Sequence, residues 1–296
     1  MNIHHHQCPI CGAEDIRFSL RTTDFTVSGT SFEIWECGKC TLRFTQDAPD
    51  AATIGQYYDS EGYISHSDTS KGLINSIYHA VRHLTMAGKR RLILSLHASK
   101  IGSLLDIGAG TGSFVRYMSE TGWEVTGVEP DEQARAQAQK VNHVRLSDSA
   151  ELLHFPAESF DMITMWHVLE HVHDLHAYVE RLKWLVKPKG KILIAVPNYT
   201  SYDASVYRNY WAAYDVPRHL YHFSPRALKT LLDGHGMELR ATRAMWYDSF
   251  YISMMSERNR KEFLGFFRGL WIGSISDLHA LINRETCSSL IYIVNR

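Results

Sequence analysis

Four of the five cysteines lie in the first 40 residues, and their spacing is that of metal ligands. Cys8 and Cys11 form one C-x-x-C pair, and Cys37 and Cys40 form a second pair 25 residues later. Each pair places two thiolates on one tight turn, and two such turns complete the tetrahedral shell of a structural Zn²⁺ site. Because that shell is closed, we expect the zinc to stabilise the fold and not to catalyse a reaction.

Two disulfides or a redox-active pair are the alternatives to this zinc site. The first residues have neither the charged nor the apolar region of a secretory signal peptide, and intracellular thiols stay reduced. Neither C-x-x-C pair opens a helix after a strand, as a redox-active pair would. Alternating apolar residues at 16–20 and 32–35 predict short strands between the pairs. We therefore interpret residues 1–50 as a small zinc-ribbon-like module.

The charge of this module disfavours nucleic acid as a partner. Residues 1–50 contain four basic and seven acidic residues, a net charge of −3, and four thiolates around Zn²⁺ would add a further −2. The whole chain of 296 residues is also near neutral, with 31 Lys and Arg against 32 Asp and Glu, and 45% of its residues are hydrophobic. A chain of this composition buries an ordinary core, so we expect one large domain, alone or with a small appendage.

A glycine-rich turn marks a second place where the sequence can do chemistry. The apolar run 101–107 stops at the turn 108–112, and a helical pattern follows from Ser113. Strand, glycine turn and helix together form the nucleotide-binding start of a doubly wound sheet. Glu129 ends the next apolar run, where a carboxylate can accept hydrogen bonds from both hydroxyls of a ribose. The alternative for Glu129 is a surface acid that favours the dipole of the following helix.

The spacing of the glycines disfavours two common nucleotide sites. The turn reads G-x-G-x-G, and Ser113 stands where a dinucleotide fingerprint has its third small residue. Asp106, directly before the turn, would repel a phosphate and attract a cationic ligand. No Gly-Lys-Ser/Thr follows the turn, as a P-loop requires. A nicotinamide dehydrogenase and a P-loop protein are therefore both disfavoured.

Four motifs in order along residues 101–197 resemble those of the class I S-adenosylmethionine (SAM)-dependent methyltransferases. They are the segments 104–112, 125–130, 159–172 and 185–197, and residues 289–294 resemble the last, antiparallel strand of that family. With its N-terminal cysteines, the chain resembles the branch that includes sugar-modifying and uncharacterised bacterial methyltransferases. The resemblance implies an α/β fold, a Rossmann-like doubly wound seven-stranded sheet in residues 101–296. The zinc ribbon of residues 1–50 and a linker with an amphipathic helix at 51–100 would precede it.

This resemblance implies that SAM is the cofactor and S-adenosylhomocysteine the product. The residues implied to bind SAM are Asp106, Gly108, Ala109, Gly110 and Gly112 for the methionine part, Glu129 for the ribose, Asp148 and Ser149 near the adenine, and Pro130 elsewhere in the cofactor site. Of Trp166 and His167, one is expected to line the cofactor or methyl-transfer site. The implied activity is in-line methyl transfer to a small-molecule acceptor, such as a sugar, a lipid head group or a secondary metabolite. An RNA or protein methyltransferase and a non-catalytic SAM-binding protein are the alternatives.

Histidines are the candidates for a general base. SAM carries its own leaving group, so the protein has mainly to align the acceptor and remove its proton. Residues 199–223 are rich in aromatic side chains, and we expect them to form a surface lid over the acceptor. His219 and His222 in this lid, and His167, are the candidate bases. Purely structural hydrogen bonding is the alternative for His219 and His222.

A metal-assisted site is a further alternative. His167, Glu170 and His171 have the spacing i, i+3 and i+4, which would place them on one face of a helix. The pattern resembles the Glu-x-x-Glu-His metal motif of small-RNA 2′-O-methyltransferases and ubiquinone-pathway O-methyltransferases, with His167 in place of the first glutamate. The alternative for His171 is packing and hydrogen bonding beneath the site.

Residues 245–284 are predicted to form a helical insertion. We expect its many apolar side chains to belong mostly to the core, with a partner surface or an apolar substrate channel as alternatives. Arg268, Asp277 and His279 disfavour a membrane span in the apolar stretch 263–282 and favour a buried or interfacial helix pair. The sequence thus predicts a cytoplasmic enzyme without a transmembrane segment, and it identifies neither the acceptor nor the oligomeric state.

Overall fold

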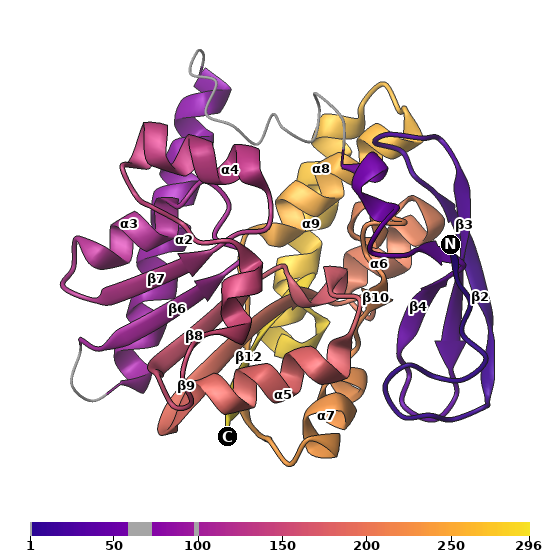
Figure 1. Cartoon of the computed structure of the whole chain (residues 1–296). Helices are drawn as coiled ribbons and strands as arrows, with labels where there is room; N and C mark the ends of the chain where they lie inside the picture. The colour runs from indigo at the N-terminus through magenta and orange to yellow at the C-terminus, as the bar shows by residue number, and fades with distance from the viewer. Residues whose placement is uncertain (1, 59–72, 98–100) are drawn as a thin grey trace. The chain divides into compact units, whose positions relative to one another are not determined.

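The computed structural model describes residues 2–58, 73–97 and 101–296 (Figure 1). Its contacts divide the chain into two compact units. The ribbon unit consists of Met1–Ile64, Leu169–Tyr178 and Ala195–Tyr292. The glycine-turn unit consists of Ser65–Val168, Val179–Ile194 and Ile293–Arg296. The domain boundaries at residues 50 and 100 remain predictions from the sequence.

A six-stranded sheet is the main feature of the fold. Its strands, in spatial order, are β11 (Glu238–Ala244), β12 (Ser289–Asn295), β9 (Val186–Pro197), β8 (Phe160–Trp166), β6 (Ser103–Ile107) and β7 (Glu124–Val128). Strand β6 pairs in parallel with both β7 and β8, and Figure 1 shows these three strands side by side. Parallel strands of this kind need helical crossovers. The predicted α/β fold is therefore confirmed.

The prediction of seven strands needs a correction, since the described residues form six. The missing strand is reduced to one parallel bridge between Ser147 and Val128 at the edge of β7. Asp148 then caps a short 3₁₀ helix, η3 (Ser149–Leu153), by accepting a hydrogen bond from the backbone N–H of Ala150. Because the chain enters this helix directly after Ser147, it does not continue as a strand and forms no longer ladder with β7.

Helices flank the strands of the glycine-turn unit. They are α2 (Leu73–Leu96), α3 (Ser113–Ser119), α4 (Glu132–Gln137) with the π-helical turn η2 (Ala138–Asn142), and η3. Helix α5 (Leu175–Leu185) begins in the ribbon unit and ends in this one. The amphipathic helix predicted from residue 70 is α2, and its predicted start lies outside the described residues. Asp131 caps α4 by accepting a hydrogen bond from the N–H of Ala134 at 2.6 Å.

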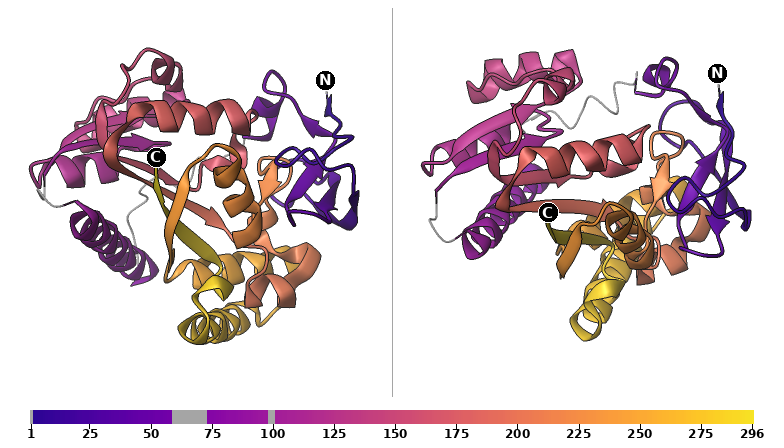
Figure 2. Two further views of the ribbon diagram at one scale, coloured as in Figure 1. Left: turned by 90° about the horizontal axis from the view of Figure 1, so that it is seen from below. Right: turned by 60° about the horizontal axis from the view of Figure 1, so that its bottom comes forward.

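The ribbon unit contains a second, four-stranded sheet (Figure 2). Its order is β10 (Tyr221–His222), β4 (Arg43–Gln46), β3 (Ser31–Cys37) and β2 (Ile16–Thr23), with a small pair of β1 (Asn2–Ile3) and β5 (Ala48–Pro49) beside it. The strands predicted between the cysteine pairs are thus present. Strand β10 comes from the predicted lid, which shows that the cysteine-bearing module and residues 221–222 share one sheet.

Helices complete the ribbon unit. They are η1 (Ile54–Tyr57), η4 (Leu169–His171), α6 (Tyr202–Tyr207), η5 (Arg208–Tyr210), η6 (Ala212–Tyr214), α7 (Pro225–Gly234), α8 (Asp248–Arg260), α9 (Gly265–Ile282) and η7 (Arg284–Thr286). Ser224 caps α7 by accepting a hydrogen bond from the N–H of Ala227, and Pro225 occupies its first turn. In the part of the chain that the structure describes, no helix combines the length and apolarity needed to cross a bilayer.

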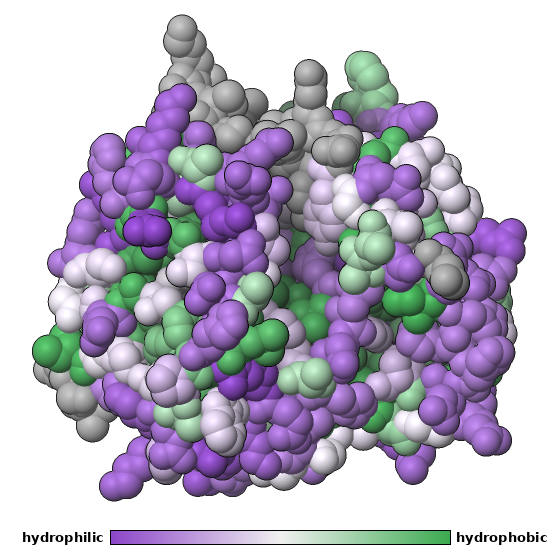
Figure 3. Space-filling view, in the orientation of Figure 1, coloured by the Kyte–Doolittle hydropathy of each residue, from purple (hydrophilic) through white to green (hydrophobic). Residues whose placement is uncertain are grey.

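The aromatic segment 199–223 is mostly core, which corrects the expectation of a surface lid. Tyr207, Trp211 and Tyr214 are buried and pack with Phe32 of β3. The Trp211 indole N–H donates to a carboxylate oxygen of Asp203 at 2.7 Å. The segment is folded into helices and a strand, and these satisfy its backbone, so it can be buried. Figure 3, by contrast, shows one face of the molecule on which hydrophilic residues predominate and hydrophobic ones form small separate patches.

Candidate functional site

The glycine turn after β6 has the backbone geometry that the sequence predicts. Gly108, Gly110 and Gly112 have φ angles of 71°, 53° and 74°, in the left-handed region that favours glycine. A Cβ on Gly108 would lie 2.4 Å from Val168, and one on Gly112 would lie 2.3 Å from Val144. A Cβ on Gly110 would meet nothing within 4 Å. Gly108 and Gly112 therefore allow close packing, while Gly110 faces open space that a ligand can enter.

Glu129 closes this turn from the end of β7. Its Oε2 accepts a hydrogen bond from the N–H of Gly110 at 2.8 Å, and its Oε1 accepts one from the N–H of Asp131 at 3.1 Å. The side chain is buried, and burial raises the pKa of Glu129. Each carboxylate oxygen has a second lone pair. Glu129 can thus accept two further hydrogen bonds, as a ribose diol requires, and a surface role is excluded.

Asp106 lies under the turn, on β6. Its side chain is only 2% exposed, and Thr164 of β8 donates a hydrogen bond from Oγ1 to its Oδ1 at 2.7 Å. Burial raises the pKa of Asp106 to about 6, although Thr164 and Lys89 act in the opposite direction. The carboxylate is therefore held in a place where its charge costs free energy. A cationic group of a ligand would offset that cost.

Lys89 of α2 is a residue that the sequence reasoning missed. Its Nζ lies 4.0 Å from the ring centroid of Trp166 and 5.6 Å from that of Phe114 on α3. The Phe114 and Trp166 rings meet edge to face at 5.8 Å. A cation, the carboxylate of Asp106 and an aromatic wall thus lie together. Lys89 belongs to the basic run 89–91 of the amphipathic helix α2, and this run alone does not indicate where the helix packs.

The predicted adenine segment lies beside Glu129. The backbone N–H of Glu129 donates to the carbonyl of Ser147 at 3.0 Å. Asp148 caps η3 and also forms an ion pair with Arg135 at 2.9 Å, while Arg135 donates to the carbonyl of Pro130. Asp148 and Pro130 are therefore held in place next to the tip of β7. Their contacts with adenine remain a prediction.

Trp166 and His167 lie where β8 ends. Trp166 is the last residue of the strand, and His167 follows with a left-handed φ of 58°. Open α/β sheets bind ligands beyond the carboxyl ends of their strands. Asp161, near the opposite end of β8, accepts hydrogen bonds from Ser103 and pairs with Lys187 at 2.8 Å, so its contacts are structural.

The four N-terminal cysteines come together in the ribbon unit. The Sγ atoms of Cys8 and Cys40 lie 3.5 Å apart, those of Cys11 and Cys37 lie 3.6 Å apart, and all four lie within 4.8 Å of one another. Such separations fit four thiolates around one tetrahedral Zn²⁺ with bonds of about 2.3 Å. Hydrogen bonding with Cys40 lowers the pKa of the Cys8 thiol to about 5. The cluster is compatible with a structural zinc.

A second group with metal-binding donors lies elsewhere in the ribbon unit. It consists of Glu170, His171 and His219, whose ligand atoms all lie within 4.8 Å of one another. The structure thus brings His219 to Glu170 and His171, and this group does not include His167. The rings of His171 and His219 meet edge to face at 4.6 Å. Burial lowers the pKa of His171 to about 4, so its imidazole is neutral at pH 7.

Backbone carbonyls set the tautomers of these two histidines. The Nδ1 of His219 lies 2.8 Å from the carbonyl of Ala213, and the Nδ1 of His171 lies 3.0 Å from the carbonyl of Arg218. A carbonyl only accepts, so both Nδ1 atoms carry the proton. Both Nε2 atoms therefore offer a lone pair, either to a proton or to a metal ion.

His222 has a different environment from His219. It lies on β10, and its Nε2 is 3.2 Å from the hydroxyl of Thr45 on β4. The Thr45 hydroxyl donates to the carbonyl of His219 at 2.7 Å, so the His222 Nε2 donates to Thr45. Burial lowers the pKa of His222 well below its usual value. These contacts hold the side chain inside the ribbon sheet.

Arg218 makes an internal salt bridge with two carboxylates. Its guanidinium is fully buried and pairs with Asp24 at 2.9 Å and with Asp215 at 2.6 Å. It also donates to the carbonyl of Tyr57 at 2.8 Å. Burial alone would raise the pKa of Asp215, but the hydrogen bonds from Arg218 lower it. Arg218 therefore joins the cysteine-bearing module to residues 215–222.

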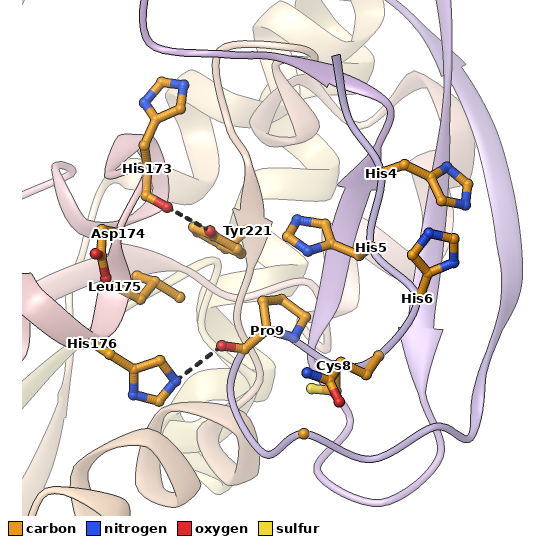
Figure 4. Close-up of a pocket in the computed structure, with 12 residues that line it drawn as sticks. His4, His5, His6, Cys8, Pro9, His173, Asp174, Leu175, His176 and Tyr221 are labelled. Carbon is orange, nitrogen blue, oxygen red and sulfur yellow. Dashed lines mark hydrogen bonds between the residues drawn. The ribbon is translucent and has the colours of Figure 1, made fainter. Parts of the chain in front are cut away.

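A histidine-lined cavity of about 640 Å³ lies in the ribbon unit (Figure 4). Its lining comes from residues 4–9, Gly12, 173–176 and Tyr221. Figure 4 shows two bonds at its wall, from His176 Nε2 to the carbonyl of Pro9 at 3.0 Å and from the Tyr221 hydroxyl to the carbonyl of His173 at 3.1 Å. Within the described part of the chain, its imidazoles form no metal-binding group. The cavity shares no residue with the glycine turn.

Comparisons with known proteins identify the family of this domain. A family model described as a methyltransferase domain matches residues 78–242, more than half of the chain. The mitochondrial ubiquinone biosynthesis O-methyltransferase of Homo sapiens is 26% identical over 163 residues, which are 50% of this chain and 44% of that protein. The ubiquinone biosynthesis O-methyltransferase of Maricaulis maris is 29% identical over 159 residues, 49% of this chain and 62% of that protein. The chain spans about half the length of these curated relatives.

A solved structure supports the same fold. The magnesium protoporphyrin IX methyltransferase of Synechocystis PCC 6803, determined with bound S-adenosylhomocysteine, has a TM-score of 0.52 at 14% identity. The match covers 83% of this chain and 100% of that one. Together with the matched family, it confirms the resemblance stated from the sequence motifs. The chain belongs to the methyltransferase domain family and has the fold of the class I SAM-dependent methyltransferases.

Proposed function

We propose that this protein transfers a methyl group from SAM to a small-molecule acceptor. The observation that carries the proposal is the hydrogen bond from the N–H of Gly110 to Glu129, beside a glycine whose Cβ position is open space. The family match includes both residues. This arrangement offers a buried carboxylate to two vicinal hydroxyls without a steric block. It fits the ribose of SAM.

The charged groups around the turn fit the amino-acid part of SAM. Asp106 would bind the ammonium group, which offsets the cost of the buried carboxylate. Lys89, which faces Trp166, would bind the carboxylate group. Pro130, Asp148 and the neighbouring Ser149 would border the adenine. When bound, SAM supplies an activated methyl group together with its leaving group.

His219 is the candidate base that the contacts favour over His222. Its proton is fixed on Nδ1 by the carbonyl of Ala213, so its Nε2 can take a proton from an acceptor hydroxyl or amine. Asp215, whose carboxylate lies 4.0 Å from the His219 ring, would stabilise the resulting imidazolium. His222 donates through its Nε2 and lies in a sheet. His167, at the end of β8, remains the third candidate.

A divalent cation on Glu170, His171 and His219 is the second candidate for this part of the chain. The two roles exclude each other, because a metal bond would occupy the Nε2 lone pair that a base needs. With a metal, an acceptor hydroxyl would lose its proton more easily through coordination. Metal analysis of the purified protein, before and after chelation, distinguishes a general base at His219 from a metal site. Zinc on the four N-terminal cysteines serves as the internal reference in this metal analysis.

The acceptor is proposed to be a small molecule. The names of the two curated relatives refer to ubiquinone biosynthesis, and that of the structural relative to magnesium protoporphyrin IX. The negative charge of residues 1–50 disfavours RNA. A sugar, a lipid head group and a secondary metabolite are the candidate classes, and we place the reaction in the cytoplasm. A protein methyltransferase and a non-catalytic SAM-binding protein are the competing proposals.

Transfer of labelled methyl from SAM into a fractionated cell extract tests the function. Label in the metabolite fraction supports the proposal, and label in RNA or protein contradicts the acceptor class. Calorimetric binding of S-adenosylhomocysteine is measured in parallel, with Glu129→Ala as the test and Glu124→Ala, an exposed glutamate on the same strand, as the matched control. Binding without label in any fraction favours the non-catalytic alternative. Absence of binding overturns the cofactor itself.

A further inference from the structure

The two helices α8 and α9 form a hairpin in the ribbon unit, and glycines set their distance. Gly265, Gly269 and Gly273 recur every fourth residue along one face of α9. A Cβ on each would lie within about 3 Å of an atom of α8, namely Cβ of Glu257, Cα of Met254 and Cα of Phe250. Small residues at this spacing let two helix backbones approach closely. The small side chains of α9 therefore face its partner helix.

The large apolar side chains of α9 point the other way. Phe267, Trp271, Leu278 and Leu281 follow one another at helical spacing, and each is more than half exposed. An amphipathic helix normally turns such a stripe toward the core. Here the stripe runs along the outer side of the hairpin, which corrects the expectation that this insertion is mostly core.

The exposure is greatest at the turn between the helices. Phe263 is 98% exposed, and Leu264, Phe266 and Phe267 are each more than half exposed. We call residues 257–268, which contain this turn, the hairpin tip. Aromatic side chains each present on the order of 150–250 Å² when uncovered. With the stripe, the tip therefore forms a patch at or above the several hundred Å² that single soluble chains usually expose.

Basic residues surround the apolar tip. The tip contains four basic residues, Arg258, Arg260, Lys261 and Arg268, and two acidic ones, which leave a net charge of +2. One of the two acids, Glu257, is buried and lies 3.5 Å from Arg268. Arg258 and Lys261 are exposed. The exposed charge of the tip is thus positive, and it lies beside exposed apolar side chains.

We propose that the hairpin tip docks onto the surface of an anionic lipid bilayer. Phenylalanine and tryptophan side chains enter the boundary between head groups and acyl chains, and flanking Lys and Arg bind anionic head groups. A second copy of this chain fits less well, because an isologous contact would bring two positive tips together. The proposal is independent of methyl transfer, since no residue of the tip belongs to the glycine turn.

Vesicle sedimentation tests the proposal with the full chain. Wild-type protein should sediment with vesicles of phosphatidylcholine and phosphatidylglycerol, and more weakly with phosphatidylcholine alone or at high salt. The triple variant Phe263→Ser, Phe266→Ser and Phe267→Ser should lower the partition constant for the mixed vesicles at least tenfold. Phe18→Ser, which removes an aromatic side chain that is 53% exposed on β2, is the matched control and should bind as wild type does.

Three outcomes would overturn the proposal. Wild-type protein could stay in the supernatant with both kinds of vesicle. The triple variant could bind as well as wild type, or Phe18→Ser could lose as much binding as the triple variant. Sedimentation equilibrium without lipid identifies a different occupant: a dimer that the triple variant converts to a monomer, with no vesicle binding, would assign the patch to a second copy.

Tryptophan quenching provides a second measurement that does not use the triple serine variant. Trp271 lies on the exposed stripe and is 68% exposed. Vesicles that contain brominated lipid should quench part of the fluorescence, and Trp271→Phe should remove that part. Trp184→Phe, at an exposed tryptophan of α5, should leave the quenching unchanged. Equal effects of the two substitutions would contradict docking through this hairpin.

Discussion

Asp106→Asn should move stability and ligand binding in opposite directions. Asp106 is buried, and Thr164 donates to its Oδ1 at 2.7 Å, a hydrogen bond that an asparagine oxygen can also accept. The substitution removes the charge and keeps the shape of the side chain. It should therefore stabilise the free protein, and it should weaken the binding of a ligand that brings an ammonium group to this place.

The size of the stability gain follows from the pKa of this carboxyl. Burial raises the pKa of Asp106 from 3.8 to about 6, a difference of about 2 pH units or about 3 kcal/mol. Between these two values the folded protein binds more protons than the unfolded chain, so wild-type stability falls as pH rises through this window. Above pH 6 the full cost of the charge is present. We expect Asp106→Asn to be more stable by about 1–3 kcal/mol at pH 7.5 and to match wild type near pH 4.

Urea unfolding at several pH values measures this difference, and other titrating groups cancel because both chains contain them. Calorimetry with S-adenosylhomocysteine at pH 7.5 measures the change in ligand affinity. Loss of a charged hydrogen-bond acceptor is worth about 1.5–3 kcal/mol, which predicts an affinity about 10- to 150-fold lower. A stability difference that does not change with pH would refute the cost assigned to the buried charge. Unchanged affinity would show that another group binds the ammonium.

Four further substitutions test other parts of the protein. Glu129→Ala should weaken S-adenosylhomocysteine binding by about 1–3 kcal/mol, measured by calorimetry against Glu124→Ala, and unchanged affinity would place the ribose elsewhere. Cys37→Ser should release one equivalent of zinc and lower the melting temperature, and a protein that contains no zinc before the substitution would contradict the ribbon site. His219→Ala should lower kcat by about 10²- to 10⁴-fold, whereas His222→Ala should mainly lower stability, and the reverse result would exchange their roles.

The sequence predicts the geometry of the glycine turn well because its signals are local. Asp106, the turn 108–112 and Glu129 lie within 25 residues, and each role follows from a strand end or a left-handed backbone. The four cysteines are also predicted correctly as one cluster, since two C-x-x-C turns have few ways to share a centre. Lys89 was missed because its role depends on where α2 packs. No residue pattern near Lys89 indicates that Trp166 lies 4.0 Å away.

The segments after β9 show what residue counts cannot predict. The many aromatic residues in 199–223 predict a surface lid, yet Tyr207, Trp211 and Tyr214 belong to the core. The apolar residues of α9 were interpreted as core, yet its stripe is exposed. Both errors have one cause, because hydrophobicity alone does not say which face of an element meets a neighbour. In α9 the decisive signal is the glycine repeat, which assigns the inner face to the smallest residues.

Two buried carboxylates beside the glycine turn link cofactor binding to stability. Burial raises the pKa values of both Asp106 and Glu129, so the free protein holds two acids where their charges are unfavourable. A ligand that brings an ammonium group to one and hydroxyl donors to the other removes part of that cost. At one hundred times its Kd, such a ligand stabilises the folded state by about 2.7 kcal/mol. If Asp106 and Glu129 bind SAM as proposed, the same carboxylates that make the free site unfavourable would favour a ligand that carries a positive charge next to a ribose.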